Sequence, residues 1–110
     1  GFPSILRAKI GCPDTPVIGF AGDGAFGISM NEMSSCARKE WPAITMVIFR
    51  NYQWGAEKRN SILWFDDNFV GTELDPELSY AKVANACGLK GVTVKTMEET
   101  TKAIKPYLKK

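Results

Sequence analysis

Two short runs of consecutive apolar residues constrain the fold most strongly. VIGFA at 17–21 and AITMVIF at 43–49 are continuous rather than alternating in polarity. Runs of this length and kind are typical of parallel strands that helices cover on both faces. A helical segment precedes the first run and another lies between the two, so the strands should be parallel with a right-handed crossover. The sequence therefore predicts an α/β fold with a mostly parallel sheet covered by helices.

The first two helices are expected at 3–10 and 29–41. Pro3 suits the first turn of a helix, where a missing N–H costs nothing. Ser29 and Glu32 have the spacing of a capping box, and Pro42 ends the pattern that follows them. Both segments would pack on the predicted strands.

The second half of the chain predicts a further helix, strand and helix. The helix at 78–88 would be closed by a glycine, the strand would occupy 91–96, and the last helix 97–108. Residues 50–79 have no clear periodicity but are rich in tryptophan and phenylalanine, which favours an ordered, functional loop. With 110 residues and no repeat, we predict one domain, 1–110.

Composition excludes several classes of function. The chain has no histidine, and Cys12, Cys36 and Cys87 are widely spaced, so neither an imidazole base nor a structural zinc site is expected. Free thiols are typical of a reducing compartment, and we expect a cytoplasmic protein. The net charge of +2 is spread along the chain, and no apolar run is long enough to cross a membrane. Nucleic acid and membrane are therefore not expected partners.

A Gly-Asp-Gly sequence at 22–24 follows the first apolar run. A tight turn is one interpretation, because glycine tolerates positive φ and Asp-Gly favours turns. The other is a ligand loop at the carboxyl end of a parallel strand, where glycines let the backbone approach a phosphate. Asp23 would repel a phosphate unless a cation lay between them. It would then hold Mg²⁺, which prefers oxygen ligands and often shares its shell with phosphates.

Asn51 directly follows Arg50 at the end of the second predicted strand, as Asp23 follows the first. Neighbouring parallel strands end at the same edge of a sheet, so the two side chains should approach each other. A turn-forming asparagine is the alternative interpretation. On the first interpretation, Asn51 supplies a second oxygen to the metal.

These residues resemble a known motif. GDG at 22–24, 26 intervening residues and then Asn51 resemble the diphosphate-binding motif of thiamine diphosphate-dependent enzymes, and the resemblance extends over essentially the whole chain. Within that family, NYQWGAEKRNSILWFDDNFVGTELD at 51–75 is most similar to the sulfoacetaldehyde acetyltransferase group.

The resemblance implies thiamine diphosphate and Mg²⁺ as cofactors and assigns a role to particular residues. Asp23 and Asn51 would bind the metal through side-chain oxygens and Gln53 through its backbone carbonyl. The residues implied to lie at the cofactor are Gly22, Gly24, Ala25, Asn51, Trp54 and Gly55. Many relatives carry two successive asparagines, whereas this chain has Arg50 at the first of those positions.

The resemblance also implies a reaction and missing partners. In the parent reaction, sulfoacetaldehyde and phosphate give acetyl phosphate and sulfite; another acetolactate synthase-type or decarboxylase-type enzyme and a non-catalytic, self-associating remnant are the alternatives. No catalytic residue is assigned to this chain, because the activating glutamate of the family lies on a separate pyrimidine-binding domain. We expect an incomplete domain that is inactive without such a domain or subunit. Four aromatic residues would have few partners in a small domain with three strands, which favours association into a dimer: Trp54, Trp64, Phe65 and Phe69.

Overall fold

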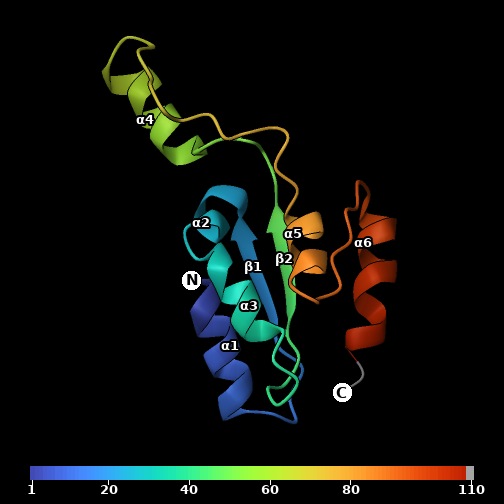
Figure 1. The fold of residues 1–110 in the computed structure, drawn as a ribbon. Coiled ribbons are helices and arrows are strands. Elements are labelled where there is room, and N and C mark those ends of the chain that lie inside the picture. The colour runs from blue at the N-terminus through green and yellow to red at the C-terminus, as the bar shows by residue number, and fades with distance from the viewer. Residues whose placement is uncertain (109–110) are drawn as a thin grey trace.

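The computed structural model describes residues 1–108, and two parallel strands lie at its centre (Figure 1). β1 (Ile18–Gly22) pairs with β2 (Thr45–Phe49), with Ile18 opposite Thr45 and Gly22 opposite Phe49. Both strands follow from the apolar runs of the sequence. The predicted α/β class with a parallel sheet and helices is confirmed.

The strands are preceded and connected by helical segments. α1 (Phe2–Gly11) carries proline in its first turn and buries Phe2 and Leu6 on one face. The connection from β1 to β2 contains α2 (Asp23–Gly27), a 3-10 helix η1 (Met30–Glu32) and α3 (Met33–Cys36).

This connection differs from the predicted helix at 29–41. Ser29 makes no side-chain capping bond, and a 3-10 turn stands where the capping box was expected. The helix also ends at Cys36, well before Pro42, and a turn follows in which the Arg38 N–H donates to the Ser35 carbonyl. The prediction was wrong here because the Glu32 N–H, which the Ser29 side chain was expected to cap, donates to the Ser29 carbonyl in the 3-10 turn. The spacing of Ser29 and Glu32 alone does not distinguish these two arrangements.

A small aromatic core lies against one face of the strands. Phe26 is 2% exposed and contacts the rings of Phe2 and Tyr80, with centroid separations of 4.9 and 5.3 Å. Met33 completes the buried cluster, and the partly buried residues packed against it include Ala21, Met46 and Ile48 from the strands. The core thus joins the segment after β1 to the distant residue Tyr80.

The strand residues Phe20 and Phe49 are 65% and 62% exposed. Their rings stack on each other at 6.2 Å between centroids. Their register positions place them on the same side of the sheet, opposite Ala21 and Ile48. Within residues 1–108, this side of the sheet keeps a large apolar area open to solvent.

Residues 50–79 contain a projecting arm rather than an aperiodic loop (Figure 1). Its helix α4 (Gly55–Trp64) was missed by the sequence analysis because the helix is polar for most of its length, with apolar residues gathered at its end. Lys58 joins the two sides of the arm, since its ammonium group pairs with Glu73 and lies 4.6 Å from the ring centroid of Phe69. The radius of gyration is 15.8 Å, against about 13 Å for a compact chain of this length.

The last part of the chain contains α5 (Tyr80–Ala86), α6 (Met97–Ile104) and a 3-10 turn η2 (Lys105–Tyr107). The side chain of Ser79 caps α5, and Gly88 follows it with φ of +85°. α6 begins with a complete capping box of Thr96 and Glu99. The predicted helix at 97–108 is therefore present up to Ile104, and the residues around the proline that follows form the 3-10 turn η2.

The predicted strand at 91–96 is absent. Gly91 is instead tied to the side chain of Asn85 by two hydrogen bonds of 3.0 and 3.1 Å, and the segment follows α5 without joining a sheet. A β-branched run becomes a strand only where a neighbouring strand offers hydrogen bonds, and within residues 1–108 the sheet consists of β1 and β2 alone. None of the helices within residues 1–108 is both long and apolar enough to cross a membrane.

Candidate binding site at the carboxyl ends of the strands

Asp23 is the most deeply buried acidic residue near the strand ends. It follows β1 directly, begins α2 and is 2% exposed. Its Oδ1 accepts a hydrogen bond from the Gly24 N–H at 3.0 Å, and its Oδ2 accepts one from the Tyr52 N–H at 2.8 Å. No lysine or arginine in residues 1–108 forms an ion pair with it. A buried carboxylate is costly unless a cation compensates it, so this group suits a bound metal ion.

Asn51 and Tyr52 form the turn that ends β2. Tyr52 has φ of +62°, a left-handed conformation that is uncommon for a residue with a side chain. Asn51 is exposed, and its Oδ1 accepts a hydrogen bond from the Gln53 N–H at 3.3 Å. The bond from Tyr52 to Asp23 joins the ends of the two strands.

Gln53 forms an isolated antiparallel bridge with Glu73. The hydrogen bonds of this bridge come from its neighbours, because the Trp54 N–H donates to the Thr72 carbonyl and the Leu74 N–H donates to the Tyr52 carbonyl. The N–H and carbonyl of Gln53 itself consequently point away from residues 72–74. No hydrogen bond to the Gln53 carbonyl is present in residues 1–108, which leaves this oxygen available to a ligand.

Glycines allow Trp54 to pack tightly on the loop. A Cβ added at Gly24 would lie 3.1 Å from the nearest atom of the Trp54 indole, and one at Gly55 would lie 3.2 Å from the Asn51 amide nitrogen. A pocket of about 350 Å³ opens beside this contact. It is lined by Asp23, Gly24, Gly27, Ile28, Met30, Trp54, Leu74, Leu78 and Tyr80.

The residues singled out by the sequence lie around one end of the sheet but do not all line this pocket. Asp23, Gly24 and Trp54 do. Gly22 and Ala25 are exposed on either side of them, while Gln53 and Gly55 are half-buried in the turn and at the start of α4. Asn51 approaches Asp23 through the backbone of Tyr52 and makes no direct hydrogen bond with it.

The oxygen groups predicted to bind a metal would fit a magnesium ion better than a transition metal. They comprise one carboxylate, one amide oxygen and one backbone carbonyl. Mg²⁺ commonly takes one or two carboxylates and completes its shell with water and phosphate. No cluster of three or more His, Cys, Asp or Glu side chains suited to a metal occurs in residues 1–108.

Tyr80 was missed by the sequence analysis, although it contacts the central residue of the site. Its hydroxyl donates a hydrogen bond of 3.0 Å to the backbone carbonyl of Asp23, which is 57 positions away in the sequence. Burial, followed by the negative charge of Asp23, raises the pKa of Tyr80, and the positive charge of Arg50 opposes this in part. The phenol therefore keeps its proton at neutral pH. No spacing rule could have identified it.

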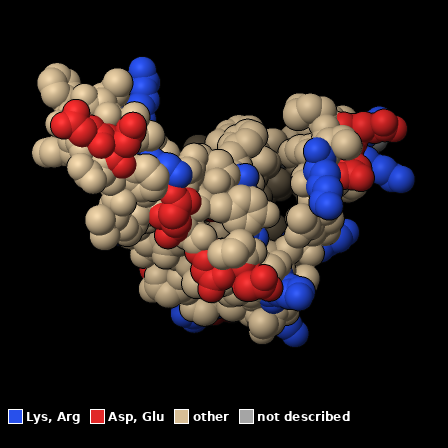
Figure 2. All heavy atoms as spheres, turned by 90° about the horizontal axis from the view of Figure 1, so that it is seen from above, with Lys and Arg blue, Asp and Glu red and all other residues tan. Residues whose placement is uncertain are grey.

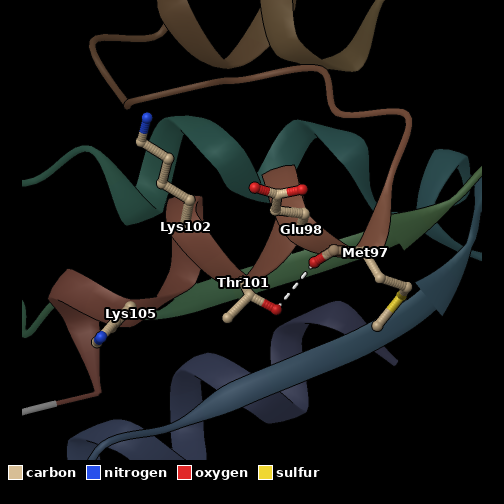
Figure 3. Close-up of a pocket in the computed structure, with 5 residues that line it drawn as sticks. All are labelled: Met97, Glu98, Thr101, Lys102 and Lys105. Atoms are coloured by element: carbon tan, nitrogen blue, oxygen red, sulfur yellow. Dashed lines mark hydrogen bonds between the residues drawn. The ribbon is translucent and has the colours of Figure 1, made fainter.

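A larger hollow of about 460 Å³ lies elsewhere, along α6 (Figure 3). All of its lining residues come from α6 and the turn after it, and none belongs to the predicted site: Met97, Glu98, Thr101, Lys102 and Lys105. Acidic and basic side chains are interspersed over the face seen from above (Figure 2), with no large area of one sign. The candidate site is thus distinguished by its buried carboxylate rather than by size or net charge.

Comparison with known proteins agrees with this geometry. Residues 1–110 match the family described as thiamine pyrophosphate enzyme, C-terminal TPP binding domain. The chain is 77% identical over 104 residues to a probable sulfoacetaldehyde acetyltransferase of Rhizobium meliloti (strain 1021), covering 94% of this chain and 18% of that protein. It is 67% identical over 109 residues to the sulfoacetaldehyde acetyltransferase of Roseovarius nubinhibens, covering 99% of this chain and 18% of that protein.

A solved structure has the same fold. The thiamine diphosphate-dependent 4-hydroxybenzoylformate decarboxylase of Rhodococcus jostii RHA1 is similar with a TM-score of 0.88 and 29% sequence identity. The match covers 98% of this chain and 20% of that one, so the chain spans about a fifth of the length of the proteins it resembles. The match over residues 1–110 places this chain in the family of thiamine pyrophosphate enzymes, as their C-terminal, cofactor-binding domain.

Proposed function

We propose that this chain binds thiamine diphosphate through a Mg²⁺ ion held at the ends of β1 and β2. The observation that carries the proposal is the Asp23 carboxylate, which is 2% exposed and has backbone N–H groups but no cationic side chain as partners. Asn51 would add its amide oxygen and Gln53 its free carbonyl. Since a diphosphate is anionic, the metal would remove the repulsion that Asp23 otherwise exerts on it.

The glycine-rich loop would approach the diphosphate. Nothing lies within 4 Å of a Cβ added at Gly22, so the backbone is open there, and Ala25 is exposed in the first turn of α2. We assign the N–H groups of Gly24 and Ala25 to the phosphate oxygens. The Gly24 N–H, which donates to Asp23, would turn to the phosphate as Asp23 takes up the metal. Trp54 and Gly55 would border the cofactor beside this loop.

We further propose that the parent protein is an acetyltransferase that converts sulfoacetaldehyde and phosphate to acetyl phosphate and sulfite. Identities of 67% and 77% to proteins of that name support it over the decarboxylase, which is 29% identical. Thiamine diphosphate would act as the electron sink in that reaction. The residues of this chain would bind and orient the cofactor, and a pyrimidine-binding domain would supply the activating carboxylate. By itself the chain should release no sulfite from sulfoacetaldehyde.

Replacement of Asp23 tests the cofactor assignment. Asp23→Asn keeps the shape of the side chain and removes its charge. It should weaken binding of thiamine diphosphate in Mg²⁺ by at least about tenfold, because the loss of a group that merely supports a metal ligand already costs about 10- to 100-fold. Calorimetry with Mg²⁺ and with a chelator would measure the difference. Asp14→Asn, at an exposed loop position, is the matched control and should bind as the wild type does. Equal affinity of Asp23→Asn and wild type would contradict the proposal.

We also propose that the chain associates into a dimer through the projecting arm. The arm exposes large apolar side chains, with Leu63, Trp64, Phe65 and Val70 each at least 64% exposed. Patches of this kind usually mark interfaces. Sedimentation at micromolar concentration should find a dimer, and a lone 12.1 kDa monomer would contradict it.

The free thiols of Cys12, Cys36 and Cys87 support a cytoplasmic location.

A further inference from the structure

Arg50 links the end of β2 to a distant part of the chain. Its guanidinium carbon lies 4.4 Å from the ring centroid of Tyr52 and 5.6 Å from that of Tyr80. Its Nη2 also donates to the backbone carbonyls of Asp75 and Pro76, at 3.2 and 3.3 Å. One side chain thus holds the turn after β2 against the segment that leads into α5.

Both tyrosines beneath Arg50 are hydrogen-bonded to Asp23. The Tyr52 N–H donates to the Oδ2 of its carboxylate, and the Tyr80 hydroxyl donates to its backbone carbonyl. Arg50 itself makes no hydrogen bond to Asp23 in residues 1–108. Apart from the direct attraction of charge, the contacts by which Arg50 can act on Asp23 therefore run through these two neighbours.

The turn at Tyr52 needs such support. Its φ of +62° is a conformation that residues with a side chain keep only where their surroundings hold them. Tyr52 is 46% exposed, so the core does not fix it. Contact with the planar guanidinium above it opposes relaxation of the turn, together with the backbone hydrogen bonds of Tyr52 to Asp23 and Leu74. If the turn relaxed, the N–H would leave the Asp23 carboxylate.

We propose that Arg50 is a positioning residue that holds Asp23 and the turn at 51–53 in the arrangement that receives the metal and the diphosphate. The inference rests on the proposed function. If only a fraction of the molecules has the binding arrangement, the apparent Kd for the ligand equals the intrinsic Kd divided by that fraction. Lysine would retain the charge but could not stack over two rings while donating from a planar group, so the arrangement requires arginine.

The full 110-residue chain and its Arg50→Lys and Arg50→Gln variants provide the test. Calorimetry would measure affinity for thiamine diphosphate in Mg²⁺, and NMR would measure exchange of the Tyr52 amide without cofactor. Both variants should bind about 5- to 30-fold more weakly, the range expected for loss of two cation–π contacts. The Tyr52 amide should exchange faster by a similar factor. Arg38→Lys is the matched control, because Arg38 lies 5.2 Å from the Trp41 ring and pairs with Glu40 away from the site.

Each other outcome has a definite meaning. Wild-type affinity in Arg50→Lys together with weak binding by Arg50→Gln would mean that charge alone acts, and this would overturn the positioning role. A lower melting temperature with unchanged affinity and unchanged Tyr52 exchange would overturn it as well, because Arg50 would then be only a structural contact. A wild-type chain that bound no cofactor would refute the proposed function. In that case, unchanged Tyr52 exchange in both variants would overturn the role of Arg50 separately.

Discussion

Removal of a single oxygen atom, in Tyr80→Phe, tests the contact between α5 and the site. The ring contact with Phe26, at 5.3 Å and 85°, would remain, since phenylalanine has the same ring. The change would delete the 3.0 Å hydrogen bond to the buried backbone carbonyl of Asp23. A hydrogen bond contributes about 0.5–1.5 kcal/mol net, and a buried acceptor left without a partner costs about 1–3 kcal/mol. Because this carbonyl stands at the start of a helix and can still accept a bond within it, we expect a loss of about 1–2 kcal/mol.

Urea denaturation followed by circular dichroism would measure this loss. The midpoint should fall while the slope of free energy against urea stays the same, because the surface exposed on unfolding does not change. In a thermal scan, the same loss should lower the melting temperature by about 4–8 °C for each kcal/mol. The two measurements should agree if unfolding is two-state.

Tyr107→Phe is the matched control for this experiment. Tyr107 is 44% exposed, and its ring, which lies 5.6 Å from the Lys90 ammonium group, is retained by phenylalanine. Its change in free energy should stay within about 0.5 kcal/mol, as for most surface substitutions. If Tyr80→Phe were no less stable than Tyr107→Phe, the hydroxyl would not join α5 to Asp23, and the reasoning about this contact would be refuted.

The remaining predictions concern pH, a helix cap and a close backbone approach. The pKa of Tyr80 is raised above its ordinary 10.0, so its contribution to stability is fully present below that value and is lost as the pH rises through the higher folded-state pKa. Between about pH 8 and 11, the free energy of unfolding should therefore fall more steeply for wild type than for Tyr80→Phe. Parallel curves of this free energy against pH would contradict the prediction. Thr96→Ala removes the cap of α6 and should cost about 1 kcal/mol, seen as faster amide exchange confined to that helix; unchanged exchange would count against the cap. Gly91→Ala would place a Cβ against the Ala81 carbonyl oxygen and should cost about 1–3 kcal/mol in urea denaturation, whereas Gly11→Ala, with nothing within 4 Å, should not; equal midpoints would refute the close approach.

The sequence by itself determined the features that depend on local pattern and simple topology. The apolar runs at 17–21 and 43–49 became β1 and β2, and the helical connection between them makes the strands parallel. Within residues 1–108 the expected cover on both faces was found on one side only, because Phe20 and Phe49 remain largely exposed on the other. The same topology requires their carboxyl ends to share one edge. Asp23 and the turn after β2 are neighbours for this reason, joined by the bond from the Tyr52 N–H.

Two segments could not be assigned from local pattern alone, because their conformation depends on neighbouring segments that the sequence does not reveal. The β-branched run at 91–96 lacks a neighbouring strand and follows α5, while the polar segment at 55–64 forms α4 on an arm held by Lys58. Strand propensity depends on a partner, and a helix without an apolar face gives no periodic signal. One error predicted an element that is absent and the other missed an element that is present, and in both cases the sequence does not show what surrounds the segment.

Only the tertiary structure decided which distant side chains support the site. Tyr80 reaches the Asp23 carbonyl across 57 positions, and Arg50 lies over both Tyr52 and Tyr80. Such contacts depend on how α5 packs against the core at Phe26, and no periodicity within one segment encodes that placement. The ligands proposed for the cofactor can be found in a linear motif because they follow the strand ends. Tyr80 comes from α5, and the partners of Arg50 at residues 75, 76 and 80 lie in the segment that leads into it, whose position is known only once the chain has folded.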